Sequence, residues 1–168
     1  PQWSEDGTKL YFKKFERGYG AIDVIEIDAA TGKTRLLLRE SSDTFVDISN
    51  FDFRLLDSGF LVLSERDGWR HLYFLSENGD MHQLTRGEFV VRSIKHIDED
   101  NRVVYFTAGG LEPGRDPYLR HLYRVNFDGG DLKLLTPENA EHEVVFSGDG
   151  KYVVDNYSRA DLAPTSVL

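Results

Sequence analysis

Histidines, carboxylates and serines are the residues of this chain that could do chemistry. The sequence has five histidines and no cysteine, which excludes disulfides, thiolate nucleophiles and cysteine metal sites together. The histidines show no i, i+4 spacing on a helix, so a zinc site is unsupported. They are His71, His82, His96, His121 and His142.

Two acidic motifs have simpler explanations than catalysis or metal binding. "DEDN" at Asp98–Asn101 is similar to part of a calcium loop, but it lacks the central glycine and the final glutamate, and we expect a hairpin turn. "EHE" at Glu141–Glu143 places both carboxylates on one face of a strand and His142 on the other. Paired carboxylates can do acid–base work, but we expect these to face solvent or a channel.

A serine nucleophile is not indicated either. The G-x-S-x-G motif, which exposes a serine at a strained strand-to-helix turn, does not occur. The nearest strings, "LDSGF" and "FSGDG", lack its flanking glycines and are typical of hairpin turns. The sequence therefore predicts no catalytic residue, no cofactor and no cofactor-binding residue, and no metal ligand.

The elements that must position these residues come from a repeat. "RHLY" occurs at Arg70–Tyr73 and again at Arg120–Tyr123, 50 positions later. One kind of hairpin recurs with spacings of 52, 42 and 49 between its turn residues, which need a positive φ: Gly7, Gly59, Asn101 and Gly150. A second kind alternates with it, around Gly32, Gly79 and Gly129. "RHLY" thus marks the same strand of two successive units.

Four strands every 42–52 residues, with no helical periodicity, predict an all-β fold of the β-propeller type. The chain holds about three and a half four-stranded blades, at roughly 1–45, 46–92, 93–141 and an incomplete 142–168. Closed propellers typically have about four to eight blades. We therefore expect a piece of a longer protein, with open sheet edges that favour self-association.

Composition narrows the possible partners. The net charge of −9 and pI near 5.0 argue against nucleic-acid binding, because an acidic surface repels phosphates. No run of about 20 apolar residues exists, so the sequence predicts no membrane span. A hydrophobic fraction of 40% excludes a disordered segment.

Several segments resemble one family. "SERDGWRHLYFL", "EPGRDPYLRHLYRVNFDG" and "FSGDGKYVVDNYSRADLAP" resemble the propeller domain of dipeptidyl peptidase IV-type serine peptidases, especially bacterial ones. The resemblance implies a propeller followed by an α/β-hydrolase domain, in a periplasmic or cell-surface enzyme that releases Xaa-Pro or Xaa-Ala dipeptides. In such an enzyme the propeller gates access, orients the peptide substrate and docks the hydrolase domain.

Part of the family's chemistry is missing from this segment. The family binds the substrate ammonium with a glutamate pair, and no "EE" occurs here, so no binding residue is carried over. The alternative function is a non-enzymatic propeller that serves as a binding scaffold.

The sharpest local feature is the turn "ERDGWRH". Its candidate residues Glu65, Arg66, Asp67, Trp69 and Arg70 either line a central cavity and touch peptide or brace neighbouring blades. We favour the brace, with an ion-pair network among the charged residues and the Trp69 ring packed beneath the turn.

The longest irregular stretch, "GGLEPGRDPY", contributes one more candidate. Arg115, paired with Glu112 or Asp116, is expected to rigidify this loop or to contact a neighbouring domain.

Overall fold

The computed structural model describes all 168 residues and contains only β-strands, in four antiparallel sheets. The predicted all-β propeller architecture is therefore confirmed. The first sheet comprises β1 (Gln2–Trp3), β2 (Lys9–Phe15), β3 (Ala21–Asp28) and β4 (Thr34–Ser41). The second comprises β5 (Asp52–Leu56), β6 (Gly59–Ser64), β7 (His71–Leu75) and β8 (Met81–Gln83). The third comprises β9 (Val90–Asp98), β10 (Val103–Gly109), β11 (His121–Asn126) and β12 (Lys133–Leu134), and the fourth β13 (Glu141–Phe146), β14 (Val153–Arg159) and β15 (Leu162–Val167).

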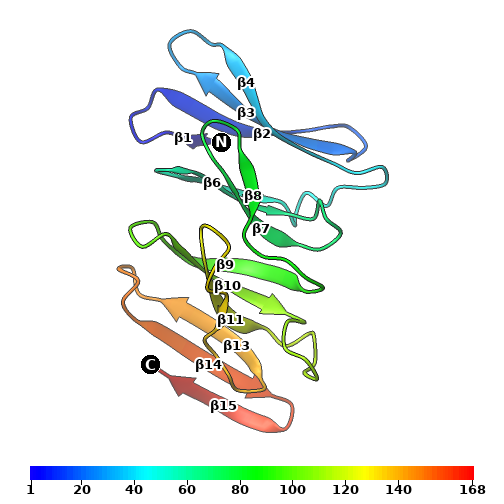
Figure 1. Cartoon of the computed structure of the whole chain (residues 1–168), viewed down its shortest axis with the longest axis vertical. Coiled ribbons are helices and arrows are strands. Elements are labelled where there is room, and N and C mark those ends of the chain that lie inside the picture. Colours follow the sequence, from blue (N-terminus) through cyan, green and yellow to red (C-terminus); the bar gives the residue numbers. More distant parts are fainter.

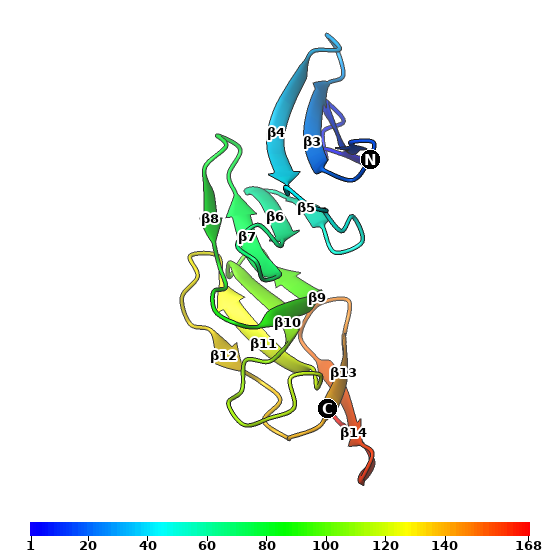
Figure 2. The same ribbon diagram turned by 90° about the vertical axis from the view of Figure 1, so that its right-hand side faces the viewer.

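Each sheet is a simple meander in which consecutive strands are neighbours, as in a propeller blade. The four sheets follow one another along the long axis of the molecule (Figures 1 and 2). The third sheet begins at Val90, three residues before the division at 93 that the repeat suggested. The structure contains no helix that is long and apolar enough to cross a membrane.

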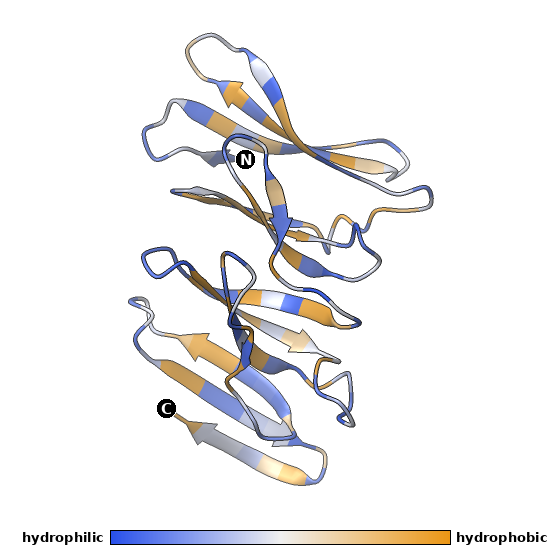
Figure 3. Ribbon diagram, viewed as in Figure 1, coloured by the Kyte–Doolittle hydropathy of each residue, from blue (hydrophilic) through white to orange (hydrophobic).

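The core lies between the sheets, and β6 shows how the sequence builds it. All six β6 residues are buried, because the second sheet has a neighbour on both faces. Phe60 and Val62 join a cluster shared with the first sheet, whereas Leu61 and Leu63 join the larger cluster shared with the third. Successive side chains therefore serve opposite faces. Figure 3 shows apolar residues along the strands and mostly polar ones in the turns.

The hairpin turns depend on positive φ angles. A Cβ on Gly59 (φ 143°) would lie 2.5 Å from the Leu75 carbonyl oxygen, so only glycine fits. In the third blade the prediction was wrong by one position: Arg102 takes the positive φ (54°), not Asn101. The Asn101 amide N–H instead bonds to Asp98 Oδ1 at 3.0 Å, as in an Asx turn.

The repeated "RHLY" segment joins each blade to the next. The Arg70 carbonyl oxygen accepts the Val91 amide N–H at 2.9 Å, and the Arg120 carbonyl oxygen accepts that of His142 at 3.1 Å. Val91 and His142 lie on the first strands of the following sheets. The duplication therefore marks the same structural position in two blades.

Candidate functional site

The candidate residues lie in loops along one side of the sheet stack, where strands of successive sheets end. The β6–β7 turn carries five of them and the β10–β11 loop carries Arg115. The β2–β3 turn and the β4–β5 connection lie on the same side, on the right in Figure 1. Loops on the side of a rigid stack can move or vary without disturbing the core, so this side suits a binding surface.

Arg66 links the second blade to the first. Its Nη2 donates to Glu40 Oε2 at 2.6 Å, and its Nε donates to Ser64 Oγ at 2.9 Å. The Ser64 hydroxyl donates in turn to Glu40 Oε1 at 2.7 Å, so both oxygens of this buried carboxylate are bound. The expected ion-pair network inside the turn is wrong, because Arg66 pairs with a carboxylate of the neighbouring blade.

The acidic residues of the turn bind amide side chains instead. Glu65 Oε1 accepts the Asn50 side-chain amide at 3.0 Å, and Asp67 Oδ2 accepts that of Gln83. These contacts fix the turn to the segments on either side of it. They leave both carboxylates at the surface, where water also solvates them.

Trp69 does not pack beneath the turn, and this expectation is wrong. The residue is 41% exposed, and its backbone N–H donates to Asp67 Oδ1 at 3.2 Å. The polar Arg66–Glu40–Ser64 cluster, rather than an indole, joins this turn to the neighbouring blade.

Arg70 joins the second blade to the third. Its Nε donates to the Asn50 carbonyl at 2.7 Å, and its Nη1 donates to the carbonyls of Arg92 at 2.7 Å and Val91 at 3.3 Å. Burial lowers the pKa of the Arg70 guanidinium from its usual value, but the group stays charged at neutral pH. One side chain thus satisfies three backbone carbonyls.

A cavity of about 530 Å³ opens beside this turn. The buried Glu40 and the exposed Phe45 lie on its wall with Arg66 and several loop residues. The Phe45 ring lies 5.7 Å from that of Tyr19, and both are about half exposed. The sequence reasoning missed these aromatics, although the signal was present, since "GYG" and "DTF" place rings in turn-forming segments.

The cavity is suited to binding and not to bond cleavage. The Glu40 carboxylate and the Arg66 guanidinium on its wall are engaged with each other, and no histidine lines the cavity to activate a serine. Polar groups and the exposed Phe45 ring remain to hold a ligand.

Arg115 fixes its loop to the next connection. Its Nη2 donates to the Pro137 carbonyl at 2.8 Å, so the expected pairing with Glu112 or Asp116 is wrong. Glu112 instead accepts the Tyr123 hydroxyl at 3.1 Å. Burial, followed by the charge of Glu112, raises the pKa of that hydroxyl above its usual value.

Three residues bring potential metal ligands together. Glu138, His142 and Asp155 each offer one ligand atom within 4.8 Å of the others. However, His142 Nδ1 lies 2.8 Å from Asp155 Oδ2, and its Nε2 lies 2.9 Å from the Glu138 carbonyl oxygen. Both ring nitrogens are therefore occupied by hydrogen bonds within the protein.

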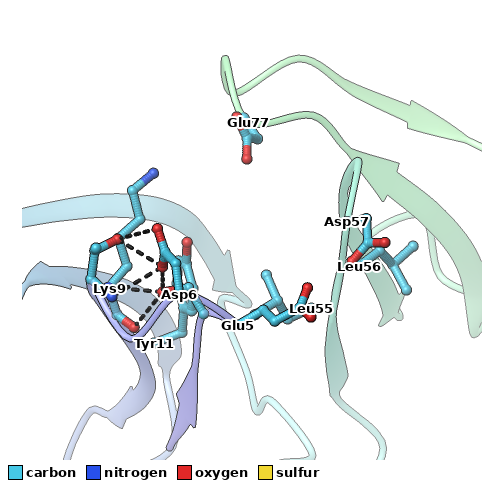
Figure 4. A pocket seen from close by; sticks show the side chains of 10 residues that line it. Glu5, Asp6, Lys9, Tyr11, Leu55, Leu56, Asp57 and Glu77 are labelled. Atoms are coloured by element: carbon cyan, nitrogen blue, oxygen red, sulfur yellow. Dashed lines mark hydrogen bonds between the residues drawn. The ribbon is translucent and has the colours of Figure 1, made fainter.

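Figure 4 shows a second cavity, of about 570 Å³, which is lined by residues of the β1–β2, β5–β6 and β7–β8 turns of the first two blades. Glu5, Asp6, Asp57 and Glu77 make its lining acidic. Hydrogen bonds from the side chain of Ser4 and then from Thr8 lower the pKa of Asp6 to about 2. This carboxylate is thus held ionised by its own turn and is a poor general base.

Residues 1–164 match the family described as the dipeptidyl peptidase IV (DPP IV) N-terminal region. "Probable dipeptidyl peptidase 4" of Emericella nidulans is 31% identical over 165 residues, which cover 90% of this chain and 21% of that protein. Dipeptidyl peptidase 4 of Arthroderma otae is 25% identical over 167 residues, covering 92% and 21%.

The crystal structure of Porphyromonas gingivalis dipeptidyl peptidase 4 superposes with a TM-score of 0.80 at 22% identity, over 95% of this chain and 22% of that one. The chain spans about a fifth of the length of the curated relatives it matches. These matches favour a peptidase portion over the alternative binding scaffold. The chain belongs to the dipeptidyl peptidase IV N-terminal region family.

Proposed function

We propose that this chain is the gating propeller portion of a dipeptidyl peptidase IV-type serine exopeptidase. The observation that carries the proposal is the family match over residues 1–164, which cover the four sheets. The sequence of these sheets lacks the G-x-S-x-G motif of a serine nucleophile. The parent enzyme releases Xaa-Pro or Xaa-Ala dipeptides from peptide N-termini. A hydrolase domain of the same parent supplies the Ser-Asp-His triad.

The cavity beside the β6–β7 turn supports a role in orienting substrate. It combines a braced charge cluster with the exposed Phe45 ring, and the Tyr19 ring lies beside Phe45 outside the cavity. An aromatic ring with a polar rim suits peptide contacts. The Arg66–Glu40 pair holds this part of the cavity wall in place. The length and shape of the bound peptide would then depend on the loop residues that form the rest of the wall.

The first test uses the purified 168-residue chain and a chromogenic Gly-Pro amide. We expect no turnover, because the one side-chain hydroxyl that contacts a histidine, that of Thr85 at His71, is buried away from substrate. Turnover that survives repurification would contradict the inert role. In the parent enzyme, Phe45→Ala should raise KM for long peptides more than for a dipeptide amide, with Phe15→Ala as an exposed aromatic control. Equal effects on both substrates would argue against orientation by this cavity.

We further propose a bacterial source and an exported enzyme, in the periplasm or at the cell surface. The sequence segments that resemble bacterial members of the family support both. Fractionation of the source cells, with activity recovered only from the cytoplasm, would contradict export.

Self-association of the isolated chain completes the proposal. β15 pairs only with β14, and all six of its residues are exposed, so one strand edge is open to a second copy. Analytical ultracentrifugation should show concentration-dependent dimers, and a strictly monomeric chain would exclude this edge as an interface.

A further inference from the structure

The junction between the third and fourth sheets contains buried acceptor atoms that no donor satisfies. His142 on β13 is 1% exposed and Asp155 on β14 is 5% exposed. The Oδ1 atom of Asp155 has no hydrogen-bond partner, and neither has Nε2 of the buried His121 on β11. Most buried polar atoms in proteins are paired, and an unpaired one often marks the place of a water molecule or an ion.

His142 is oriented in the way that metal-binding histidines are. Its Nε2 lies 2.9 Å from the Glu138 carbonyl oxygen, which can only accept, so Nε2 carries a hydrogen. Its Nδ1 then faces Asp155 Oδ2 at 2.8 Å. A histidine that binds a metal through one ring nitrogen commonly donates the other N–H to a backbone carbonyl. A proton can hold a ring nitrogen and a carboxylate oxygen together, and so can a metal ion that binds both.

Glu138 adds a second carboxylate from the connection between β12 and β13. One ligand atom from each of Glu138, His142 and Asp155 lies within 4.8 Å of the other two. Zinc bonds of about 2.1 Å place tetrahedral ligand atoms about 3.4 Å apart, so Nδ1 and Oδ2 would move slightly apart and the Glu138 carboxylate would move closer. The Glu138 side chain is exposed, so it can rotate toward the pair without disturbing the core.

The surrounding groups favour a positive ion of a particular kind. The His121 ring lies 5.0 Å from the His142 ring, and its Nδ1–H donates to the Thr136 carbonyl at 3.1 Å. A lone pair on Nε2 of His121 is therefore buried in the same junction. One imidazole nitrogen and two carboxylates suit a borderline ion such as Zn²⁺ better than Ca²⁺ or Mg²⁺, which prefer oxygen ligands alone.

We propose that Glu138, His142 and Asp155 form a binding site for one divalent ion of the zinc type. Three protein ligands leave a fourth position for a water molecule. The ion would fasten the β12–β13 connection to the two strands that carry the other ligands. The site shares no residue with the cavity beside the β6–β7 turn, so it stabilises the fourth sheet and is separate from the proposed peptide contacts.

The corresponding histidine one blade earlier is a natural comparison. His71 Nε2 lies 2.9 Å from the Gly87 carbonyl oxygen, but its Nδ1 lies 3.0 Å from the Thr85 hydroxyl and not from a carboxylate. A neutral hydroxyl is a poor zinc ligand, and no cluster of potential ligands includes His71. We therefore expect no ion at that junction.

Equilibrium dialysis of the 168-residue chain against micromolar Zn²⁺ at pH 7.5 tests the site. We expect one bound ion per chain, which excess Mg²⁺ or Ca²⁺ does not displace. Glu138→Gln should weaken binding by at least about tenfold, and Asp155→Asn by more than that. Glu143→Gln is the matched control, because it removes the same charge from the opposite face of β13 and should leave the affinity unchanged.

The proposal is overturned if Zn²⁺ does not bind, or if Glu138→Gln binds it as tightly as the native chain does. An equal loss in Glu143→Gln would also overturn it, since the ion would then be held by surface charge alone. If Asp155→Asn does not fold, the exposed Glu138→Gln variant still decides. NMR provides a second readout: Zn²⁺ should shift the ring signals of His142 and leave those of His71 in place, and the reverse would contradict the site.

Discussion

The two "RHLY" junctions share a backbone frame but differ in what fills it. In both, the leucine amide donates to a threonine hydroxyl, from Leu72 to Thr85 at 3.0 Å and from Leu122 to Thr136 at 2.8 Å. In both, the arginine carbonyl accepts an amide of the next blade. The frame therefore depends on backbone groups and one threonine.

The side chains packed in the two junctions differ most at one position, which is Phe89 in the first junction and Ala140 in the second. At the first, Phe89 lies edge-on to His71 at 4.8 Å within a cluster of 15 buried residues. At the second, Ala140 occupies the corresponding place, and His142 and Asp155 fill the space. A repeated backbone thus supports an apolar joint between the second and third sheets and a polar joint between the third and fourth.

The largest expected effect is on the apolar joint. Phe89→Ala should lower the free energy of unfolding by about 3–5 kcal/mol, because it leaves a cavity beside His71. Denaturant unfolding at pH 7.5 measures this loss. Phe45→Ala is the control, because the Phe45 side chain is 57% exposed and its removal should change the free energy of unfolding by about 0.5 kcal/mol or less. Equal losses in both variants would mean that the joint is not packed as described.

The polar joint should respond next. Asp155→Ala should destabilise by about 3 kcal/mol, because it leaves His142 buried without its anionic partner. Asp155→Asn keeps an oxygen acceptor and should lose less, about 1 kcal/mol. Similar losses in the two variants would show that the pair does not act through the His142 hydrogen bond.

The two arginines sharpen the comparison. Arg70→Ala should cost about 2 kcal/mol, because three backbone carbonyls lose a charged donor. Arg120→Ala should cost less than about 1 kcal/mol, since its partner Glu141 is at the surface and water replaces the contact. Thermal unfolding of the two variants shows which junction depends more on its arginine. A larger loss in Arg120→Ala than in Arg70→Ala would contradict the hydrogen bonds described for Arg70.

The smallest effect belongs to the turn itself. Trp69→Ala should change the free energy of unfolding by less than about 1 kcal/mol, because the ring is 41% exposed. Chemical denaturation checks this. A loss near 3 kcal/mol would show that the indole is buried in solution.

Local patterns in the sequence determined the blades and the family. Alternating apolar residues, glycine turns and a repeat of about fifty residues depend only on neighbours along the chain, so they can be read without a structure. The specific "SERDGWRHLY" and "GRDPYLRHLYRVNFDG" segments pointed to the peptidase family, which the match over 1–164 shows.

The partners of the charged and aromatic residues were decided by the tertiary structure alone. Arg66 meets Glu40, 26 residues away, because the first two blades pack face to face. Trp69 was expected beneath its turn and lies exposed. His121 and His142 carry no shared motif, and only the stacking of the third and fourth sheets brings their rings together. Periodicity fixes which face a side chain points to, but the packing of whole sheets decides what it meets there.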